Sequence, residues 1–138
     1  KGRGEILDFF EWDLTEKVVL VYPNIPISTP WAYRHFRNYL TSEGEKKSSL
    51  RLTNTSKSVK FSALLIKPVF FDNNFEPLVF ATYPKIKGVR EMMEKENAVF
   101  SRLSGSGSTV FGLFEKDRNC DTLSSKFPDC FVTVAAFI

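Results

Sequence analysis

Apolar residues along the chain fall into runs that predict five β-strands. Val18–Tyr22 is apolar on both faces, which is typical of a strand buried in the middle of a sheet. Gly4–Phe10 also fits a strand, with Ile6, Asp8 and Phe10 on one face and Leu7 and Phe9 on the other. β-Branched and aromatic residues favour strands in three more segments, Ala98–Leu103, Thr109–Phe114 and Phe131–Ile138.

A spacing close to 3.6 residues predicts a helix from Thr29 to Leu40. We expect Thr29 to cap its amino end and Pro30 to take the first helical position, where a missing N–H has no cost. The apolar stripe of this helix consists of Ala32, Phe36, Tyr39 and Leu40.

Helical spacing also predicts a short helix over Phe75–Thr82 and a longer one that opens at Pro84. The apolar face of the longer helix consists of Ile86, Val89 and Met93. In the remaining segments we expect a polar loop over Ser42–Lys57, a helix over Ser58–Val69, and one or two helical turns within Lys116–Lys126.

The order of these elements predicts the fold class. Helices fall between the second and third strands and between the fourth and fifth strands. This order is typical of an α+β split sandwich, in which a mostly antiparallel sheet carries its helices on one face. A chain of 138 residues can bury a core of its own, so we expect a single domain over residues 1–138.

Composition and charge exclude several classes of protein. A hydrophobic fraction of 43% excludes disorder, and no apolar run approaches the ~20 residues needed to cross a bilayer. The net charge of +3 is too small to indicate nucleic-acid binding by itself. Cys120 and Cys130 form no C-x-x-C motif, which favours free thiols and a cytoplasmic location. His35 is the sole histidine, which excludes a His-rich metal site.

Candidate chemistry lies between the two strands of the predicted hairpin, in Ser104-Gly105-Ser106-Gly107-Ser108. Two glycines one residue apart permit positive φ angles and consecutive outward N–H groups, a concavity that accepts an anion such as phosphate. The same residues also make an ordinary hairpin turn, and the sequence leaves both interpretations open. Neither a Walker loop nor a dinucleotide fingerprint fits, because no Gly-Lys-Ser/Thr and no helix follows.

The start of the helix at Thr29 is a second candidate site. Its first turn combines the hydroxyl of Thr29, free backbone N–H groups, and the aromatic side chains of Trp31 and Tyr33 off the apolar stripe. A helix amino end favours anions, and an exposed aromatic ring can stack on a flat ligand. Helix capping and core packing explain the same residues, so both interpretations remain.

Four stretches, taken in order, resemble the GHMP kinase superfamily, which comprises galactokinase, homoserine kinase, mevalonate kinase and phosphomevalonate kinase. Ser104–Phe111 is similar to the third signature of that superfamily. The other stretches are Gly2-Arg3-Gly4-Glu5, Pro23 with Ile27–Tyr33, and Asn73–Glu76 with Tyr83-Pro84. Together they resemble the C-terminal domain of the members that phosphorylate 4-diphosphocytidyl-2-C-methyl-D-erythritol.

The resemblance implies a ferredoxin-like C-terminal domain and an ATP- and Mg²⁺-dependent phosphoryl transfer to the 2-hydroxyl of that substrate, a step of non-mevalonate isoprenoid biosynthesis. It implies that the phosphates of ATP are supported by Gly105, Ser106, Gly107 and Ser108. It also implies that Thr29 lies near the acceptor sugar and that Tyr33 stacks on cytosine.

The chain also departs from the family pattern. Asn74 stands where the family usually has Asp, and the helical segment after the hairpin is shorter. The family's glycine-rich phosphate loop and Lys/Asp catalytic pair belong to an N-terminal domain, and nothing here matches them. We therefore expect the C-terminal half of a kinase, beginning at Lys1 without Met, with no catalytic residue or metal site of its own and no turnover alone.

Two alternatives remain open at this point. One is another GHMP kinase, of the homoserine or mevalonate type, which would have no use for cytidine stacking by Tyr33. The other is a non-enzymatic α+β module that binds RNA through exposed aromatic residues and a cluster of lysines. That cluster consists of Lys46, Lys47, Lys57 and Lys60.

Overall fold

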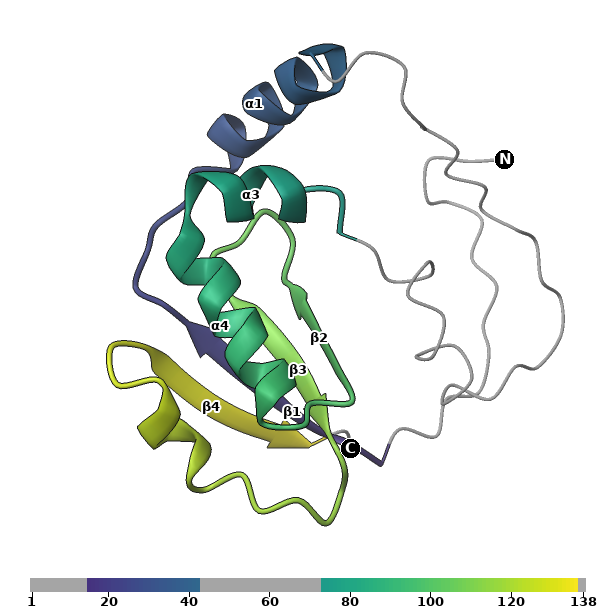
Figure 1. The fold of residues 1–138 in the computed structure, drawn as a ribbon, viewed down its shortest axis with the longest axis vertical. Helices are drawn as coiled ribbons and strands as arrows, with labels where there is room; N and C mark the ends of the chain where they lie inside the picture. Colours follow the sequence, from purple (N-terminus) through teal and green to yellow (C-terminus); the bar gives the residue numbers. More distant parts are fainter. Residues whose placement is uncertain (1–14, 43–72, 137–138) are drawn as a thin grey trace, which may run out of the picture.

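Four antiparallel strands and three α-helices make up the computed structural model, which describes residues 15–42 and 73–136 (Figure 1). The strands are β1 (Lys17–Tyr22), β2 (Phe100–Leu103), β3 (Val110–Phe114) and β4 (Phe131–Ala136). The helices are α1 (Thr29–Ser42), α3 (Glu76–Thr82) and α4 (Pro84–Lys95), with a short 3₁₀ helix, η2 (Leu123–Lys126).

The sheet has the strand order β2-β3-β1-β4, and every neighbouring pair is antiparallel. Val19 in the central strand β1 pairs with Gly112 of β3 on one side and with Val134 of β4 on the other. β1 and β2 both run antiparallel to β3, which lies between them, so the connection through the helices is a split βαβ unit. Among the described strands, β2 and β4 lie at the two edges of the sheet.

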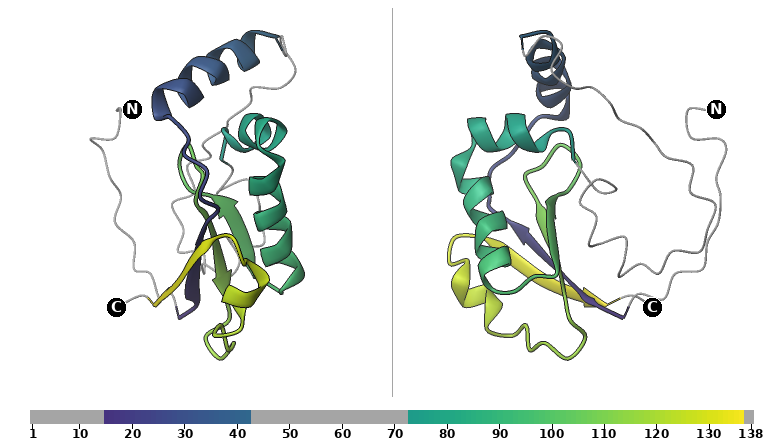
Figure 2. Two further views of the ribbon diagram at one scale, coloured as in Figure 1. Left: turned by 90° about the vertical axis from the view of Figure 1, so that its left-hand side faces the viewer. Right: turned by 45° about the vertical axis from the view of Figure 1, so that its right-hand side comes forward.

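The core lies between one face of the sheet and the helices α3 and α4, which the two views of Figure 2 place beside the sheet. Gly112 permits this close packing, because a Cβ there would lie 2.9 Å from the sulfur of Met93. The buried side chains that meet in the core include Val19, Val21, Val79, Ile86, Val89, Met93, Val110, Phe114 and Leu123. Helix α1 extends beyond the end of the sheet and contacts α3 (Figure 1).

Most of the predicted elements are confirmed. The two-sided apolar run forms the central strand, the hairpin and the last strand form as expected, and the predicted face of α4 is buried. The expected helical turn after Asp121 is η2. The strand predicted over Gly4–Phe10 and the helix predicted over Ser58–Val69 lie outside the described residues. Within the described ranges, no helix is long and apolar enough to cross a membrane.

Candidate functional site

A Ser/Gly loop, residues 104–109, connects β2 to β3 at the end of the sheet that faces α1 and α3. The Ser104 N–H donates to the Thr109 carbonyl at 2.8 Å, and the Gly107 N–H donates to the Ser104 carbonyl at 2.9 Å. Gly105 and Gly107 have φ angles of +56° and +89°, which explains why glycine is needed at both places. The loop is therefore a hairpin turn with its own internal hydrogen bonds.

The amino end of α1 lies directly beside this loop. The Thr29 and Ser106 hydroxyl oxygens are 3.2 Å apart, a hydrogen bond that joins residues 77 positions apart in the sequence. The expected capping role of Thr29 is wrong. Thr29 is itself the first residue of the helix, and the Ser28 side chain accepts from the Trp31 N–H at 3.4 Å, so the Thr29 hydroxyl is available to the loop.

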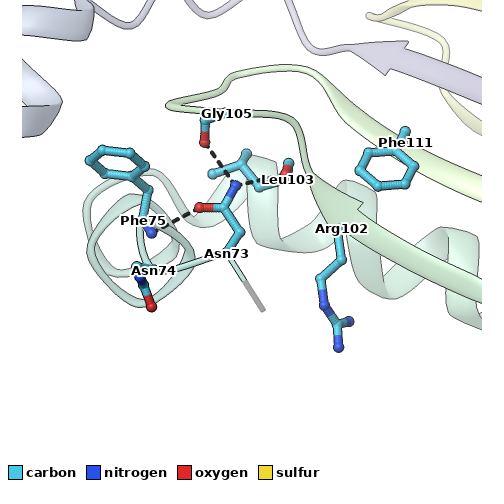
Figure 3. A pocket seen from close by; sticks show the side chains of 7 residues that line it. All are labelled: Asn73, Asn74, Phe75, Arg102, Leu103, Gly105 and Phe111. Carbon is cyan, nitrogen blue, oxygen red and sulfur yellow. Dashed lines mark hydrogen bonds between the residues drawn. The ribbon is translucent and has the colours of Figure 1, made fainter. Parts of the chain in front are cut away.

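Asn73 holds the other side of the loop (Figure 3). Its side-chain nitrogen donates to the carbonyls of Leu103, at 2.7 Å, and Gly105, at 2.8 Å. Its side-chain oxygen accepts from the Phe75 N–H at 2.9 Å. Glu76 adds a fourth contact, because its carboxylate accepts from the Leu103 N–H at 2.8 Å.

Sequence reasoning assigned Asn73 to a local helix-capping segment and gave Glu76 no role in the loop. The local part of that interpretation agrees with the hydrogen bond to Phe75. The contacts to Leu103 cross 30 and 27 residues, and no local pattern indicates them. No sequence signal marks Glu76, because its burial, 9% exposed, appears only in the structure, where a buried carboxylate requires a partner.

Aromatic rings surround Phe75 at the junction of α1 and α3. The exposed ring of Tyr33 meets Phe75 edge-on, with centroids 5.0 Å apart, and Phe36 lies at 5.2 Å. Trp31 instead stacks on His35, at 4.6 Å, and contacts Tyr83. Of the two aromatic residues predicted in the first turns of α1, Tyr33 is therefore the one with most of its surface, 61%, open to a ligand.

An open depression of about 390 Å³ lies between the loop and the segment before α3 (Figure 3). Gly105 and Phe75 both line it, so Phe75 touches both the depression and Tyr33. Arg102 supplies a positive charge at its edge and lies over the Phe100 ring at 4.8 Å. The full lining is Asn73, Asn74, Phe75, Arg102, Leu103, Gly105 and Phe111.

The four predicted loop residues differ in what they can reach. Gly105 is exposed and Ser106 half-exposed. Ser108 is 3% exposed, and its hydroxyl has no hydrogen-bond partner among the described residues. A Cβ on Gly107 would lie 3.1 and 3.2 Å from the δ-methyl groups of Leu103 and Ile27, so the side chains of these two residues pack closely against Gly107.

The fit of the loop to a phosphate group depends on its backbone donors. Those of Ser104 and Gly107 are used inside the loop, whereas no described residue accepts from the N–H groups of Gly105, Ser106 and Ser108. Ser108 is buried, so Gly105 and Ser106 are the two residues of these three whose N–H groups beside left-handed glycines suit an anion. Among residues 15–42 and 73–136, no three His, Cys, Asp or Glu side chains are grouped so that they could hold a metal ion.

Comparison with known sequences places these features in a family. Residues 60–132 match the family described as GHMP kinases C terminal. The chain is 38% identical over 120 residues to a 4-diphosphocytidyl-2-C-methyl-D-erythritol kinase of Prosthecochloris aestuarii, covering 87% of the chain and 40% of that protein. An enzyme of the same name from Chlorobium phaeobacteroides is 37% identical over 130 residues, covering 94% of the chain and 44% of that protein.

A solved structure has a similar fold. The crystal structure of a 4-(cytidine 5'-diphospho)-2C-methyl-D-erythritol kinase superimposes with a TM-score of 0.59 at 20% identity, covering 99% of this chain and 48% of that one. The chain thus spans less than half the length of the relatives it matches.

Proposed function

This chain belongs to the GHMP kinases, and from that premise we propose that it is the C-terminal domain of a kinase that transfers a phosphoryl group from ATP to the 2-hydroxyl of 4-diphosphocytidyl-2-C-methyl-D-erythritol. The product would enter isoprenoid biosynthesis. The names of the curated relatives support this substrate. The partners of the chain would be the two small molecules and its own N-terminal kinase domain.

The contact between Thr29 and Ser106 is the observation that carries the proposal. Phosphoryl transfer depends on holding the acceptor hydroxyl and the phosphate in line, about 3–3.5 Å apart. The 3.2 Å contact between these two hydroxyl oxygens supports the proposal, because it brings the start of α1 and the Ser/Gly loop to one place. Thr29 would lie beside the acceptor sugar while the loop supports the phosphates.

Each predicted residue has a role in this arrangement. Gly105 and Ser106 would direct N–H and hydroxyl groups toward the phosphates, where developing charge is stabilised by fixed donors. Gly107 and Ser108 would support the loop from inside, since one is packed against Leu103 and the other is buried. Tyr33 would stack on the cytosine ring with its exposed face.

ATP would bind between this loop and the N-terminal domain. When bound, Mg²⁺ neutralises charge on the phosphates, and the proposal gives the described residues no part in holding it. The catalytic base would also come from the N-terminal domain. We place the protein in the cytoplasm, because its free cysteines, Cys120 and Cys130, suit a reducing compartment.

Replacement of Tyr33 by Ala in the full-length enzyme tests the proposed substrate. Stacking of a base on an aromatic ring is worth about 1–3 kcal/mol, so the KM for the cytidyl substrate should rise about 5- to 150-fold while the KM for ATP stays the same. Tyr33→Phe keeps the ring and should behave nearly as the wild type. An unchanged KM in Tyr33→Ala would instead favour a GHMP kinase that acts on a substrate without a base.

The 138-residue chain by itself is the second arm of the test. We expect no ATP-dependent phosphorylation from it and restored activity in the full-length protein. Turnover by the isolated chain would contradict the assignment of catalysis to an N-terminal domain.

A further inference from the structure

The end of strand β2 is held by side chains from one short segment, residues 73–76. Among the described strands β2 lies at the edge of the sheet, and Leu103 is its last residue. The Leu103 N–H donates to the carboxylate of Glu76 at 2.8 Å, and the Leu103 carbonyl accepts from Asn73 at 2.7 Å. The side chains of this segment therefore bond both backbone groups of Leu103 at the point where β2 enters the Ser/Gly loop.

Asn73 also fixes the orientation of a peptide group inside the loop. Its side-chain nitrogen donates to the Gly105 carbonyl at 2.8 Å. In a planar trans peptide the carbonyl and the next N–H point in opposite directions. Because the Gly105 carbonyl is held toward Asn73, the N–H of Ser106 is directed away from Asn73. This contact therefore sets the direction of one of the donors that the proposed function assigns to ATP.

The carboxylate of Glu76 is itself held in place. It is 9% exposed, and its second oxygen lies 3.6 Å from a guanidinium nitrogen of Arg90. Arg90 is anchored in turn by Glu94, at 2.8 Å. A charged acceptor forms a hydrogen bond roughly twice as strong as a neutral one, so Leu103 is held firmly.

Phe75 lies between Asn73 and Glu76 in the sequence and supports the Tyr33 ring. The Asn73 side-chain oxygen holds its N–H at 2.9 Å, and its ring meets Tyr33 at 5.0 Å and Phe36 at 5.2 Å. A single side chain, that of Asn73, thus bonds both the Ser/Gly loop and the residue against which Tyr33 rests.

We propose that residues 73–76 are a positioning segment that fixes the spacing between the Ser/Gly loop and the Tyr33 ring, and so between the phosphate and base subsites of the enzyme. This inference rests on the proposed function for the identity of the two subsites. The clamp on the loop does not depend on it. Asn73, Phe75 and Glu76 act through other residues and need not touch a substrate.

Amide hydrogen exchange in the full-length protein tests the clamp without any substrate. Asn73→Ala should speed exchange of the Leu103, Ser104 and Gly107 amides about tenfold or more, because the loop opens more often when its anchors are removed. Asn119→Ala is the matched control. Asn119 accepts from the Asp121 N–H at 2.8 Å, so that variant removes a similar local hydrogen bond without touching the loop.

Glu76 offers a test by conservative replacement. Glu76→Gln keeps an oxygen that can accept from Leu103, so exchange should stay within about threefold of the wild type, whereas Glu76→Ala should resemble Asn73→Ala. If Asn73→Ala fails to fold, Asn73→Asp takes its place, because it keeps the shape and the bond to Phe75 but lacks the donors to the loop.

Steady-state kinetics then test the link to Tyr33. Phe75→Leu should raise the KM for the cytidyl substrate about 2- to 10-fold, the worth of a lost aromatic pair, and leave the KM for ATP within twofold. Asn73→Ala should raise both KM values. Phe80→Leu is the control: it removes a half-buried ring of α3 that lies under Arg90, and it should change neither KM value.

The outcomes separate the clamp from the proposed function. Exchange in Asn73→Ala that matches Asn119→Ala would overturn the clamp. Faster exchange with unchanged KM values in both Asn73→Ala and Phe75→Leu would overturn the positioning role. Faster exchange in a full-length protein that phosphorylates no cytidyl substrate would support the clamp and reject the proposed function.

Discussion

Replacing Gly107 by Ala is expected to destabilise this domain by about 1.5–4 kcal/mol, and Gly105→Ala by only about 0.5–1 kcal/mol. Both glycines have positive φ angles, +89° and +56°, so both substitutions place a side chain in a backbone conformation that L-residues avoid. The two positions differ in their surroundings. A Cβ at Gly105 meets nothing within 4 Å, whereas one at Gly107 meets Leu103 and Ile27 at 3.1 and 3.2 Å.

The magnitudes follow from these two contributions. The left-handed conformation costs a non-glycine residue about 1–2 kcal/mol, and loss of unfolded-state entropy returns about 0.4–1 kcal/mol. This leaves the small net loss at Gly105. At Gly107, forcing a methyl group against two packed side chains adds about 1–3 kcal/mol.

Urea unfolding of the two variants and the wild type measures the difference, provided that the transitions share one slope. Thermal unfolding should agree, because a loss of 3 kcal/mol lowers the Tm by about 10 °C in a domain of this size. If Gly107→Ala were no less stable than Gly105→Ala, the packing of Leu103 and Ile27 behind the loop would not be as described. Equal losses at both positions would leave only the backbone conformation as a cause.

Two further predictions concern residues outside the candidate site. Glu96 pairs with Arg118 at 3.2 Å and with Lys126 at 3.4 Å. Glu96→Gln should therefore lower the free energy of unfolding by about 1 kcal/mol in 0.1 M salt and by clearly less in 1 M NaCl. A loss that is independent of salt in urea unfolding would refute this. Burial raises the pKa of the Cys130 thiol; the charge of Lys85 opposes this rise and that of Asp129 adds to it. Because only the thiolate reacts, alkylation by iodoacetamide should be slow at pH 7 and should speed up about tenfold per pH unit up to the pKa. Mass spectrometry with Cys130→Ser as the reference locates the label, and rapid labelling at neutral pH would contradict the burial.

Local physical chemistry was enough to predict most of the fold. The run Val18–Tyr22 is apolar on both faces because Val19 and Val21 lie in the main core, while Val18 packs into a second cluster with Phe100 and Leu113. The three apolar positions of α4 recur at helical spacing because that one face meets the sheet. In these segments the burial that stabilises the fold also repeats with the period of the element, so the sequence pattern reveals it.

The site was predicted less completely, because its contacts join residues that lie far apart in the sequence. Ser28 and Thr29 are both good capping residues, and only the position of Ser106 determines which hydroxyl turns to the helix and which to the loop. Asn73 fulfils its local role through its oxygen, and its nitrogen serves the loop. The spacing of residues in the sequence predicts the local role of such a side chain but not its contact with a distant segment.

The two interpretations of the Ser/Gly loop, a hairpin turn and an anion cradle, prove compatible. Its internal hydrogen bonds are those of a turn, yet a turn alone does not require a hydroxyl from α1 and the Asn73 side chain to hold it from outside, with Glu76 holding Leu103 just before it. Such anchoring fixes the directions of backbone donors before any ligand arrives, which is what stabilisation of charge during phosphoryl transfer requires. The anchors, more than the glycines, therefore favour a loop built for an anion.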